Sequence, residues 1–310
     1  MTARGTPRIG LVATGDAAMV AEAEALGADA LWVGGHIASP NPGVEPMAWL
    51  HRLAGQTERI TIGSAVLLLP LYPPALVAKQ VADLDRITGG RVVLGIGVGG
   101  EYPAEFSAVQ VPLAERGRRT DEAIPLIRRL WTGDPVDSPG PFFPMSGVAL
   151  QPPPVTPGGP PIVVAGRQLP AMRRAALLGD GWIPYMYSPR RYAESVTTIR
   201  GIAADAGRDL TGFRWIAYVP VCADEDGARA RRDAADFLGG TYRQGFDAMV
   251  GRIAAVGTPA EVAARLREYV DAGADELVLL PARRDPDQLR LLLTTVAAAV
   301  RAAPVSGSRQ

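Results

Sequence analysis

The chain alternates between short, continuous runs of apolar residues and longer segments in which apolar residues recur every three or four positions. Continuous apolar runs bounded by glycine or proline predict buried strands, whereas the longer period predicts helices that bury one face. Because the runs are apolar throughout, we expect parallel strands that are covered on both faces. Eight strands are predicted, over residues 9–13, 30–33, 60–66, 91–96, 162–165, 181–184, 213–219 and 276–280.

Amphipathic helices are predicted between these strands. Within residues 75–87, Val77, Val81 and Leu84 share one face, and Lys79 lies away from it. Seven of the eight strands are followed by a plain helix, which favours an α/β fold of the closed TIM (β/α)8 barrel type. An open doubly wound sheet is the alternative. The other helices are predicted over residues 46–55, 119–131, 171–178, 189–206, 259–272 and 286–302, with a first helix that Asp16 caps and Gly27 ends.

Two segments interrupt this alternation. Residues 132–161 contain ten of the 28 prolines, and Phe142-Phe143 with residues 148–150 predict a short hairpin around Ser146-Gly147. This connection runs from a helix to a strand, so a barrel would place it on the face away from the chemistry. Residues 224–252 predict extra helices after the seventh strand, with a break at Gly239-Gly240.

Length and composition limit the possible classes of protein. The 310 residues are 47% hydrophobic, enough for one barrel domain over residues 1–310, with a mobile tail at 303–310. The 32 basic residues balance 32 acidic ones, so nucleic acid and anionic membranes are not predicted partners. No apolar segment reaches the ~20 residues of a membrane span. Cys222 is the only cysteine and is predicted to be buried, so we expect a cytoplasmic protein without disulfides.

The most distinctive stretch is residues 91–100, an apolar strand that ends in Gly97, Gly99 and Gly100. Glycines leave peptide N–H groups uncovered, so a flat ring or a phosphate can lie on the main chain. The spacing imitates a dinucleotide-binding fingerprint, but Pro103 follows and the next predicted helix starts only near Arg119. A strand whose glycines merely form a tight exit turn is the other alternative.

Six motifs stand out along the chain. They are Gly89-Gly-Arg-Val-Val-Leu-Gly-Ile-Gly-Val-Gly99 and the runs at residues 62–70, 74–85, 114–123, 130–134 and 179–184. In combination they resemble the bacterial luciferase-like superfamily, in particular its branch that uses the deazaflavin coenzyme F420. The resemblance implies a TIM barrel, a cofactor ring at the carboxyl ends of the strands, hydride transfer at the central ring, and a homodimer.

His36 is the only histidine that follows a predicted strand. The resemblance implies that it lies near the reacting carbon and acts in proton transfer, for which an imidazole that titrates near neutral pH is suited. Relatives commonly place an acidic residue before this histidine. Here Gly35 stands at that position, so we expect His36 to lack its usual orienting partner, and a structural histidine is the alternative. His51 is predicted to lie on a solvated helix face.

The resemblance also assigns residues to the cofactor. It implies that a bulge with a non-prolyl cis peptide at Ala65-Val66 supports the ring, while Leu68 replaces a threonine that contacts it in relatives. Val98, Gly99 and Gly100 match the loop that contacts the ring.

Gly166 and Arg167 match the family's phosphate-binding turn before a helix. A helix N-terminus offers free N–H groups and a partial positive charge, and Arg167 adds a charged fork. No metal site is predicted.

The sequence argues against a sugar phosphate as substrate. Relatives that oxidise sugar phosphates place a carboxylate directly after the glycines, where this chain has Gly100, and Glu101 and Glu105 are interpreted as displaced surface acids. Lysines for a substrate phosphate have no counterpart, since Lys79 lies on a barrel helix.

The predicted function is therefore an F420-dependent oxidoreductase acting on an unknown small organic molecule. An FMN-dependent luciferase-like monooxygenase is one alternative. A non-catalytic flavin or deazaflavin carrier is another, suggested by the missing carboxylates at positions 35 and 100. Tyr185 and Tyr187 are candidates to line the pocket.

Overall fold

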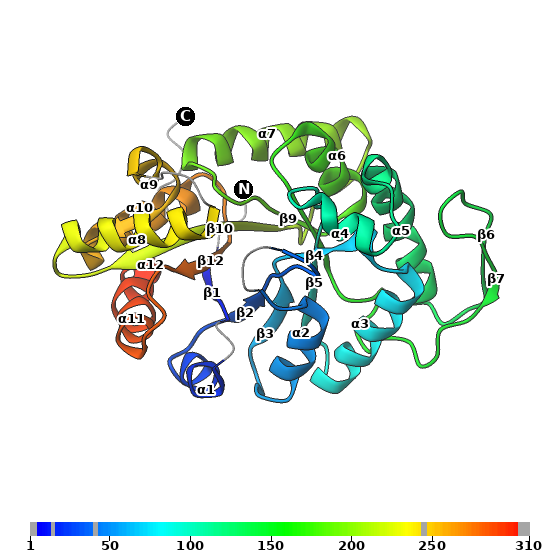
Figure 1. Cartoon of the computed structure of the whole chain (residues 1–310), viewed down its shortest axis with the longest axis horizontal. Helices are drawn as coiled ribbons and strands as arrows, with labels where there is room; N and C mark the ends of the chain where they lie inside the picture. Colours follow the sequence, from blue (N-terminus) through cyan, green and yellow to red (C-terminus); the bar gives the residue numbers. More distant parts are fainter. Residues whose placement is uncertain (1–4, 14–15, 40–42, 243–246, 303–310) are drawn as a thin grey trace. The chain divides into compact units, whose positions relative to one another are not determined.

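The computed structural model describes residues 5–13, 16–39, 43–242 and 247–302 (Figure 1). Two compact units divide the chain: a central unit of residues 33–181, and a terminal unit formed by residues 1–32 and 182–310. The predicted tail at 303–310 lies outside the described residues.

The central unit contains parallel strands with buried side chains. Strand β3 (Thr61–Ser64) pairs with β5 (Val92–Gly97), and β5 pairs with β8 (Ile162–Ala165). The short strand β4 (Leu67–Leu68) continues beside the end of β5, with Leu67 opposite Ile96. Their carboxyl ends therefore meet at one edge of the unit, where parallel strands present functional residues.

The terminal unit repeats this parallel arrangement. Strand β1 (Arg8–Val12) pairs with β2 (Ala30–Val33) and β12 (Glu276–Pro281). The long strand β10 (Arg214–Ala223) pairs with β12 and with β11 (Ala255–Gly257), and β9 covers Gly181–Ile183. The short strand β11 was not predicted from the sequence.

Helices follow the strands along the chain, and most of them begin and end within a few residues of the predicted limits (Figure 1). In the central unit, α2 packs on β3 and α3 packs on β5. Asp16 caps α1 as predicted, accepting a hydrogen bond from the N–H of Ala18 at 2.8 Å. The first helices are α1 (Ala17–Ala25), α2 (Pro46–Ala54), α3 (Pro74–Thr88), α4 (Pro103–Ala108), α5 (Arg116–Leu130) and α6 (Leu169–Leu178). The remaining ones are α7 (Pro189–Asp205), α8 (Gly227–Tyr242), α9 (Asp247–Ile253), α10 (Pro259–Asp271), α11 (Pro286–Arg290) and α12 (Ala297–Ala302).

The proline-rich connection contains the predicted hairpin, but the residues predicted to form its first strand were wrong. The paired strands are β6 (Val136–Ser138) and β7 (Met145–Val148). Phe142 and Phe143 lie in the connection between them, because the carboxylate of Glu122 accepts hydrogen bonds from both of their backbone N–H groups. The backbone of this connection is therefore bonded to α5 rather than to β7.

The predicted helix break at Gly239-Gly240 was also wrong, because α8 continues through both glycines to Tyr242. A glycine inside a helix costs roughly 0.5–1 kcal/mol relative to alanine. The apolar face of α8 offsets this cost, since Ala230, Ala234 and Leu238 are fully buried in one cluster with Cys222.

Candidate active site

His36 and Glu105 form a close pair in the central unit. The Nδ1 atom of His36 lies 3.0 Å from Oε2 of Glu105, although 69 residues separate them. Glu105 is completely buried, whereas the His36 side chain keeps 29% of its surface exposed. The prediction that His36 lacks an acidic partner was therefore wrong, and so was the interpretation of Glu105 as a surface acid. Glu101, by contrast, is exposed.

The unpredicted helix α4 places Glu105. Pro103 begins α4, and Glu105 stands in its first turn. Its Oε1 accepts hydrogen bonds from the backbone N–H groups of Ile37 at 2.9 Å and Ala38 at 3.3 Å. Both oxygens are thus occupied by the segment that carries His36, so the carboxylate holds the imidazole and its backbone together.

This pairing determines how the imidazole presents itself. When the carboxylate of Glu105 is ionised it only accepts hydrogen bonds, and Nδ1 of His36 is then the donor that faces it. In the neutral ring, Nε2 is then the acceptor, and in the charged ring it is a donor. The rings of Tyr102 and His36 pack edge to face, with ring centroids 4.9 Å apart at 73°. His36 is therefore held in one orientation with Nε2 directed away from Glu105.

Close backbone packing explains why the acidic partner is not at position 35. A Cβ built on Gly35 would overlap the carbonyl oxygen of Val44, so no side chain fits there without movement of the main chain. The carboxylate instead comes from α4, a separate element. Because this contact joins distant parts of the chain, the local pattern around His36 could not reveal it.

The residues predicted to contact the cofactor ring lie close together. The Ala65–Val66 peptide bond is cis, as the resemblance implied. A Cβ on Gly97 would lie 2.8 Å from Cγ2 of Val66, and one on Gly99 would lie 3.1 Å from Cδ1 of Leu68. The bulge after β3 and the glycine turn after β5 therefore pack against each other, and the turn has no room for larger residues.

Apolar side chains surround this turn. Leu68, Leu71 and Phe106 are buried in one cluster with partly buried neighbours, namely Ile37, Val66, Tyr72, Val109, Val111 and Leu113. The hydroxyl of Tyr72 donates to Oε1 of Glu45 at 2.7 Å. Burial, followed by the hydrogen bond and charge of Glu45, raises the pKa of Tyr72 above its usual range. Tyr72 thus stays neutral and keeps its hydroxyl proton, which it donates in the hydrogen bond to Glu45.

The predicted phosphate-binding turn lies between β8 and α6, in the place that the motif requires. A Cβ on Gly166 would lie 2.5 Å from the Cβ of Ala171 in the first turn of α6, so the backbone approaches that helix closely. Arg167 follows and is partly buried. Its contact with a phosphate stays a prediction.

The remaining candidates lie in other environments. Tyr187 is only 3% exposed and packs against Trp182 in the core of the terminal unit, with ring centroids 5.8 Å apart, whereas Tyr185 is 38% exposed. Cys222 is buried as predicted, and burial raises the pKa of its thiol to about 11. His51 is exposed on α2, as expected.

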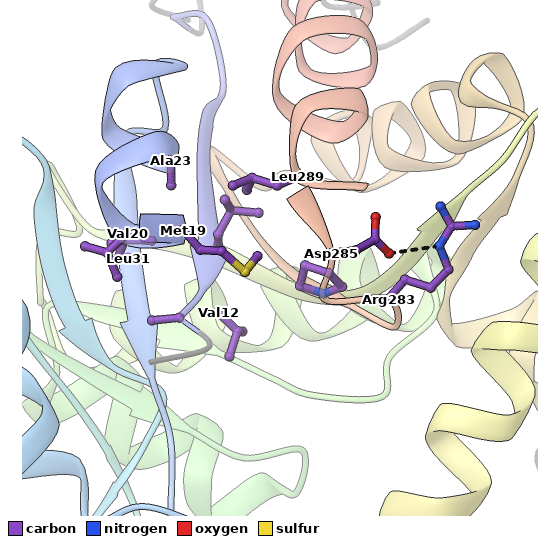
Figure 2. Close-up of a pocket in the computed structure, with 11 residues that line it drawn as sticks. Val12, Met19, Val20, Ala23, Leu31, Arg283, Asp285 and Leu289 are labelled. Atoms are coloured by element: carbon purple, nitrogen blue, oxygen red, sulfur yellow. Dashed lines mark ion pairs between the residues drawn. The ribbon is translucent and has the colours of Figure 1, made fainter. Parts of the chain in front are cut away.

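The structure contains an apolar hollow in the terminal unit as well, lined by Met19, Val20 and Leu31, with Arg283 and Asp285 at its edge (Figure 2). Its cavity of about 20 Å³ has room for little more than a water molecule.

Among the described residues, no three metal-ligating side chains form a group. No helix in the described part of the chain is long and apolar enough to cross a membrane.

The model of the luciferase-like monooxygenase family matches residues 13–276. The chain belongs to this family. An uncharacterized protein of Mycobacterium tuberculosis is 35% identical over 167 residues, which are 54% of this chain but only 57% of that relative. The phthiodiolone/phenolphthiodiolone dimycocerosates ketoreductase of the same organism is 29% identical over 283 residues, covering 83% of this chain and 70% of the ketoreductase.

Solved structures establish the fold of this family member. An F420-dependent secondary alcohol dehydrogenase superposes with a TM-score of 0.84 at 19% identity, over 96% of this chain and 99% of the dehydrogenase. A monooxygenase from Streptomyces bottropensis superposes with a TM-score of 0.81 at 24% identity, over 94% of this chain and 98% of the monooxygenase. The protein is thus a luciferase-like TIM barrel, as predicted, and the open doubly wound sheet is excluded.

Proposed function

We propose that this protein is an oxidoreductase that transfers a hydride between coenzyme F420 and a small organic molecule. The observation that carries the proposal is the His36–Glu105 pair. A buried carboxylate orients a partly exposed imidazole, and the pair lies beside the glycine turn at the carboxyl ends of β3 and β5. Hydride transfer to a carbonyl carbon requires a proton at the carbonyl oxygen, and hydride removal from an alcohol carbon requires the hydroxyl to lose its proton. A held imidazole can move that proton in either direction.

The residues at this edge fit a flat ring with a phosphate. Gly97 and Gly99 carry no side chain, and Val66 and Leu68 pack directly against the main chain of this turn. The deazaflavin would supply the hydride when bound. Glu105 would keep Nδ1 of His36 protonated, and Nε2 would accept a proton from a substrate hydroxyl or donate one to a carbonyl oxygen.

The names of two similar proteins support an alcohol or a ketone as substrate. One is a secondary alcohol dehydrogenase that uses F420, and the other is a ketoreductase. Both names describe the interconversion of a secondary alcohol and a ketone, which is the chemistry that a hydride donor and a proton donor perform together. The apolar cluster beside His36 suits an uncharged organic molecule better than a sugar phosphate.

An FMN-dependent monooxygenase is the second candidate. It is favoured by the family's name and by a structural neighbour, a Baeyer–Villiger monooxygenase in complex with FMN, with a TM-score of 0.75 at 17% identity. The non-catalytic carrier loses its main argument, since Glu105 supplies the carboxylate that positions 35 and 100 lack.

Equilibrium titration of the protein with F420 and with FMN, followed by fluorescence, tests the cofactor. We expect F420 to bind more tightly. FMN binding at least tenfold more tightly, a difference of ~1.4 kcal/mol, would overturn the proposal. Turnover with reduced F420 and a series of ketones, or oxidised F420 and secondary alcohols, then distinguishes an enzyme from a carrier.

A further inference from the structure

Arg116 lies against the glycine turn after β5. It is the first residue of α5, and it is partly buried. A Cβ built on Gly100 would lie 3.0 Å from Nε of Arg116 and 3.5 Å from its Cζ. Gly100 has a φ of +114°, which side chains rarely adopt. The guanidinium therefore lies directly over bare main chain at the edge where the ring is proposed to bind.

The charge of Arg116 has no carboxylate partner among the described residues. Its Nη1 donates to the carbonyl oxygen of Leu113 at 2.9 Å, and this is the only hydrogen bond of its guanidinium within the described part of the chain. Neighbouring carboxylates are engaged elsewhere: Glu115 pairs with Arg119 at 2.9 Å, and Asp121 with Arg174 at 2.7 Å. The edge formed by Nε and Nη2 thus remains available for an acceptor on a ligand.

Arg283 of the terminal unit provides a contrast. This partly buried arginine pairs with Asp224 at 2.5 Å, with Asp285 at 3.4 Å and with Asp233 at 3.8 Å, and Figure 2 shows the pair with Asp285. Desolvating a charge is unfavourable unless a partner compensates for it. Arg283 receives this compensation from its own chain, whereas Arg116 does not, which indicates that a bound anion completes its environment.

The first turn of α5 contacts both the glycine turn after β5 and helix α6. Arg116 covers the glycine turn. Towards α6, the carbonyl oxygen of Gly117 accepts a hydrogen bond from Nη2 of Arg174 at 3.2 Å. Arg174 belongs to α6, the helix that follows the Gly166–Arg167 turn. A ligand that reaches from the glycine turn towards α6 would therefore pass the start of α5.

We propose that Arg116 binds the phosphate of the cofactor, with Nε and Nη2 donating to two phosphate oxygens. A guanidinium matches phosphate in this side-on, two-bond geometry, and the bonds are strengthened by both charges. The proposal rests on the proposed function for the class of the ligand. It goes beyond that function because it assigns a charged phosphate contact to α5, whereas the sequence motif assigns this role only to the turn at Arg167.

The test compares F420 with its chromophore alone, the deazaflavin that ends in a hydroxyl and has no phosphate. Arg116→Ala should raise the Kd for F420 by about tenfold or more, because a charge-assisted contact is lost. It should leave the Kd for the phosphate-free chromophore unchanged. Arg116→Lys keeps the positive charge but not the paired N–H donors of the guanidinium. It should cause an intermediate loss of affinity for F420 and none for the chromophore.

Arg118→Ala is the matched control, because Arg118 is an exposed arginine of the same helix and its guanidinium stacks on Phe142, 5.2 Å from the ring centroid. This variant should bind both ligands as the wild type does. The ratio of the two Kd values within one variant is the decisive quantity, because partial unfolding would weaken both ligands equally.

An unchanged F420 Kd in Arg116→Ala would overturn the proposal. An equal loss for both ligands would overturn it as well, because Arg116 would then support the ring or the fold rather than the phosphate. If the wild type binds FMN instead of F420, the proposed function fails, but the same comparison between FMN and riboflavin still tests Arg116.

Discussion

Glu105 in the central unit and Glu276 in the terminal unit are both buried glutamates, with 0% and 1% of their surface exposed, but their partners differ. Glu276 accepts hydrogen bonds from Nε1 of Trp32 at 3.0 Å and from Nη2 of Arg214 at 2.7 Å. Both partners are permanent donors, so neither of them can accept a proton. Glu105 instead faces His36, a titratable ring whose Nε2 has no hydrogen bond to a described residue.

The difference teaches how to interpret a buried carboxylate. A cluster whose members all satisfy one another stabilises or specifies the fold. A cluster with one exposed, titratable atom is prepared to act on something that the chain does not contain. The predictions below test this distinction between Glu276 and Glu105.

The largest expected effect follows from removing the titratable partner. His36→Ala should lower turnover by ~10²–10⁴-fold, because a positioned acid or base is lost. Affinity for F420 should change far less, since one neutral hydrogen bond contributes only ~0.5–1.5 kcal/mol. Cofactor absorbance during turnover measures the first quantity, and fluorescence titration measures the second.

His51→Ala is the control for this variant, because His51 lies on the exposed face of α2 and should leave both quantities unchanged. Wild-type turnover in His36→Ala would make His36 a structural histidine, and the functional interpretation of Glu105 would fail with it.

At Glu276 we expect the opposite result, a loss of stability without a loss of turnover. Glu276→Ala should lower the free energy of unfolding by ~3–5 kcal/mol, because it leaves the guanidinium of Arg214 and the indole N–H of Trp32 without their acceptor. Denaturant unfolding measures this loss, and turnover per folded molecule should stay near the wild-type value. Glu276→Gln, which keeps the shape and one acceptor oxygen, should lose less stability. A Glu276→Ala variant that is fully stable but inactive would reverse the assignment.

A smaller loss of activity is expected when Glu105 is replaced by its neutral isostere. Glu105→Gln keeps the volume, but its single acceptor oxygen cannot serve both the imidazole and the backbone N–H groups of Ile37 and Ala38. Turnover should fall by roughly 10–100-fold, by analogy with the range seen when a residue that orients a metal-binding histidine is changed. Steady-state kinetics measures this, and an unchanged rate would show that His36 needs no carboxylate.

The smallest effect concerns binding alone. Arg167→Ala should weaken F420 binding by roughly tenfold without lowering the melting temperature, because the turn before α6 can still offer backbone N–H groups to the phosphate. Titration with F420 and thermal unfolding of the same sample check both parts. Unchanged affinity would mean that Arg167 does not contact the phosphate and would leave Arg116 as the charged candidate.

Much of this protein follows from its sequence, because strands and helices depend on local patterns. Continuous apolar runs predicted the parallel strands, and Asp16 was identified as a cap from its position before an amphipathic segment. Motifs such as residues 89–99 identified the family, since the glycines that shape a turn must stand at defined spacings. The motif at residues 62–70 located the Ala65–Val66 bulge, and His36 was identified as the only histidine that follows a predicted strand.

Errors arose where tertiary packing opposed a local preference. Gly239-Gly240 predicted a break, but the buried face of α8 holds the helix together through both residues. Phe142 and Phe143 favoured a strand, yet hydrogen bonds from their backbone to Glu122 place them in a connection. In both cases side chains remote in sequence determined the local backbone.

The sequence by itself determined the fold class, the glycine turn and the presence of a histidine after the second strand, because each depends on residues close together in the chain. Only the tertiary structure decided that Glu105 lies against His36 and that Arg116 lies over Gly100 without a carboxylate partner among the described residues. These contacts join separate elements. They depend on how the carboxyl ends of the strands and the starts of the helices pack together, which no local pattern records.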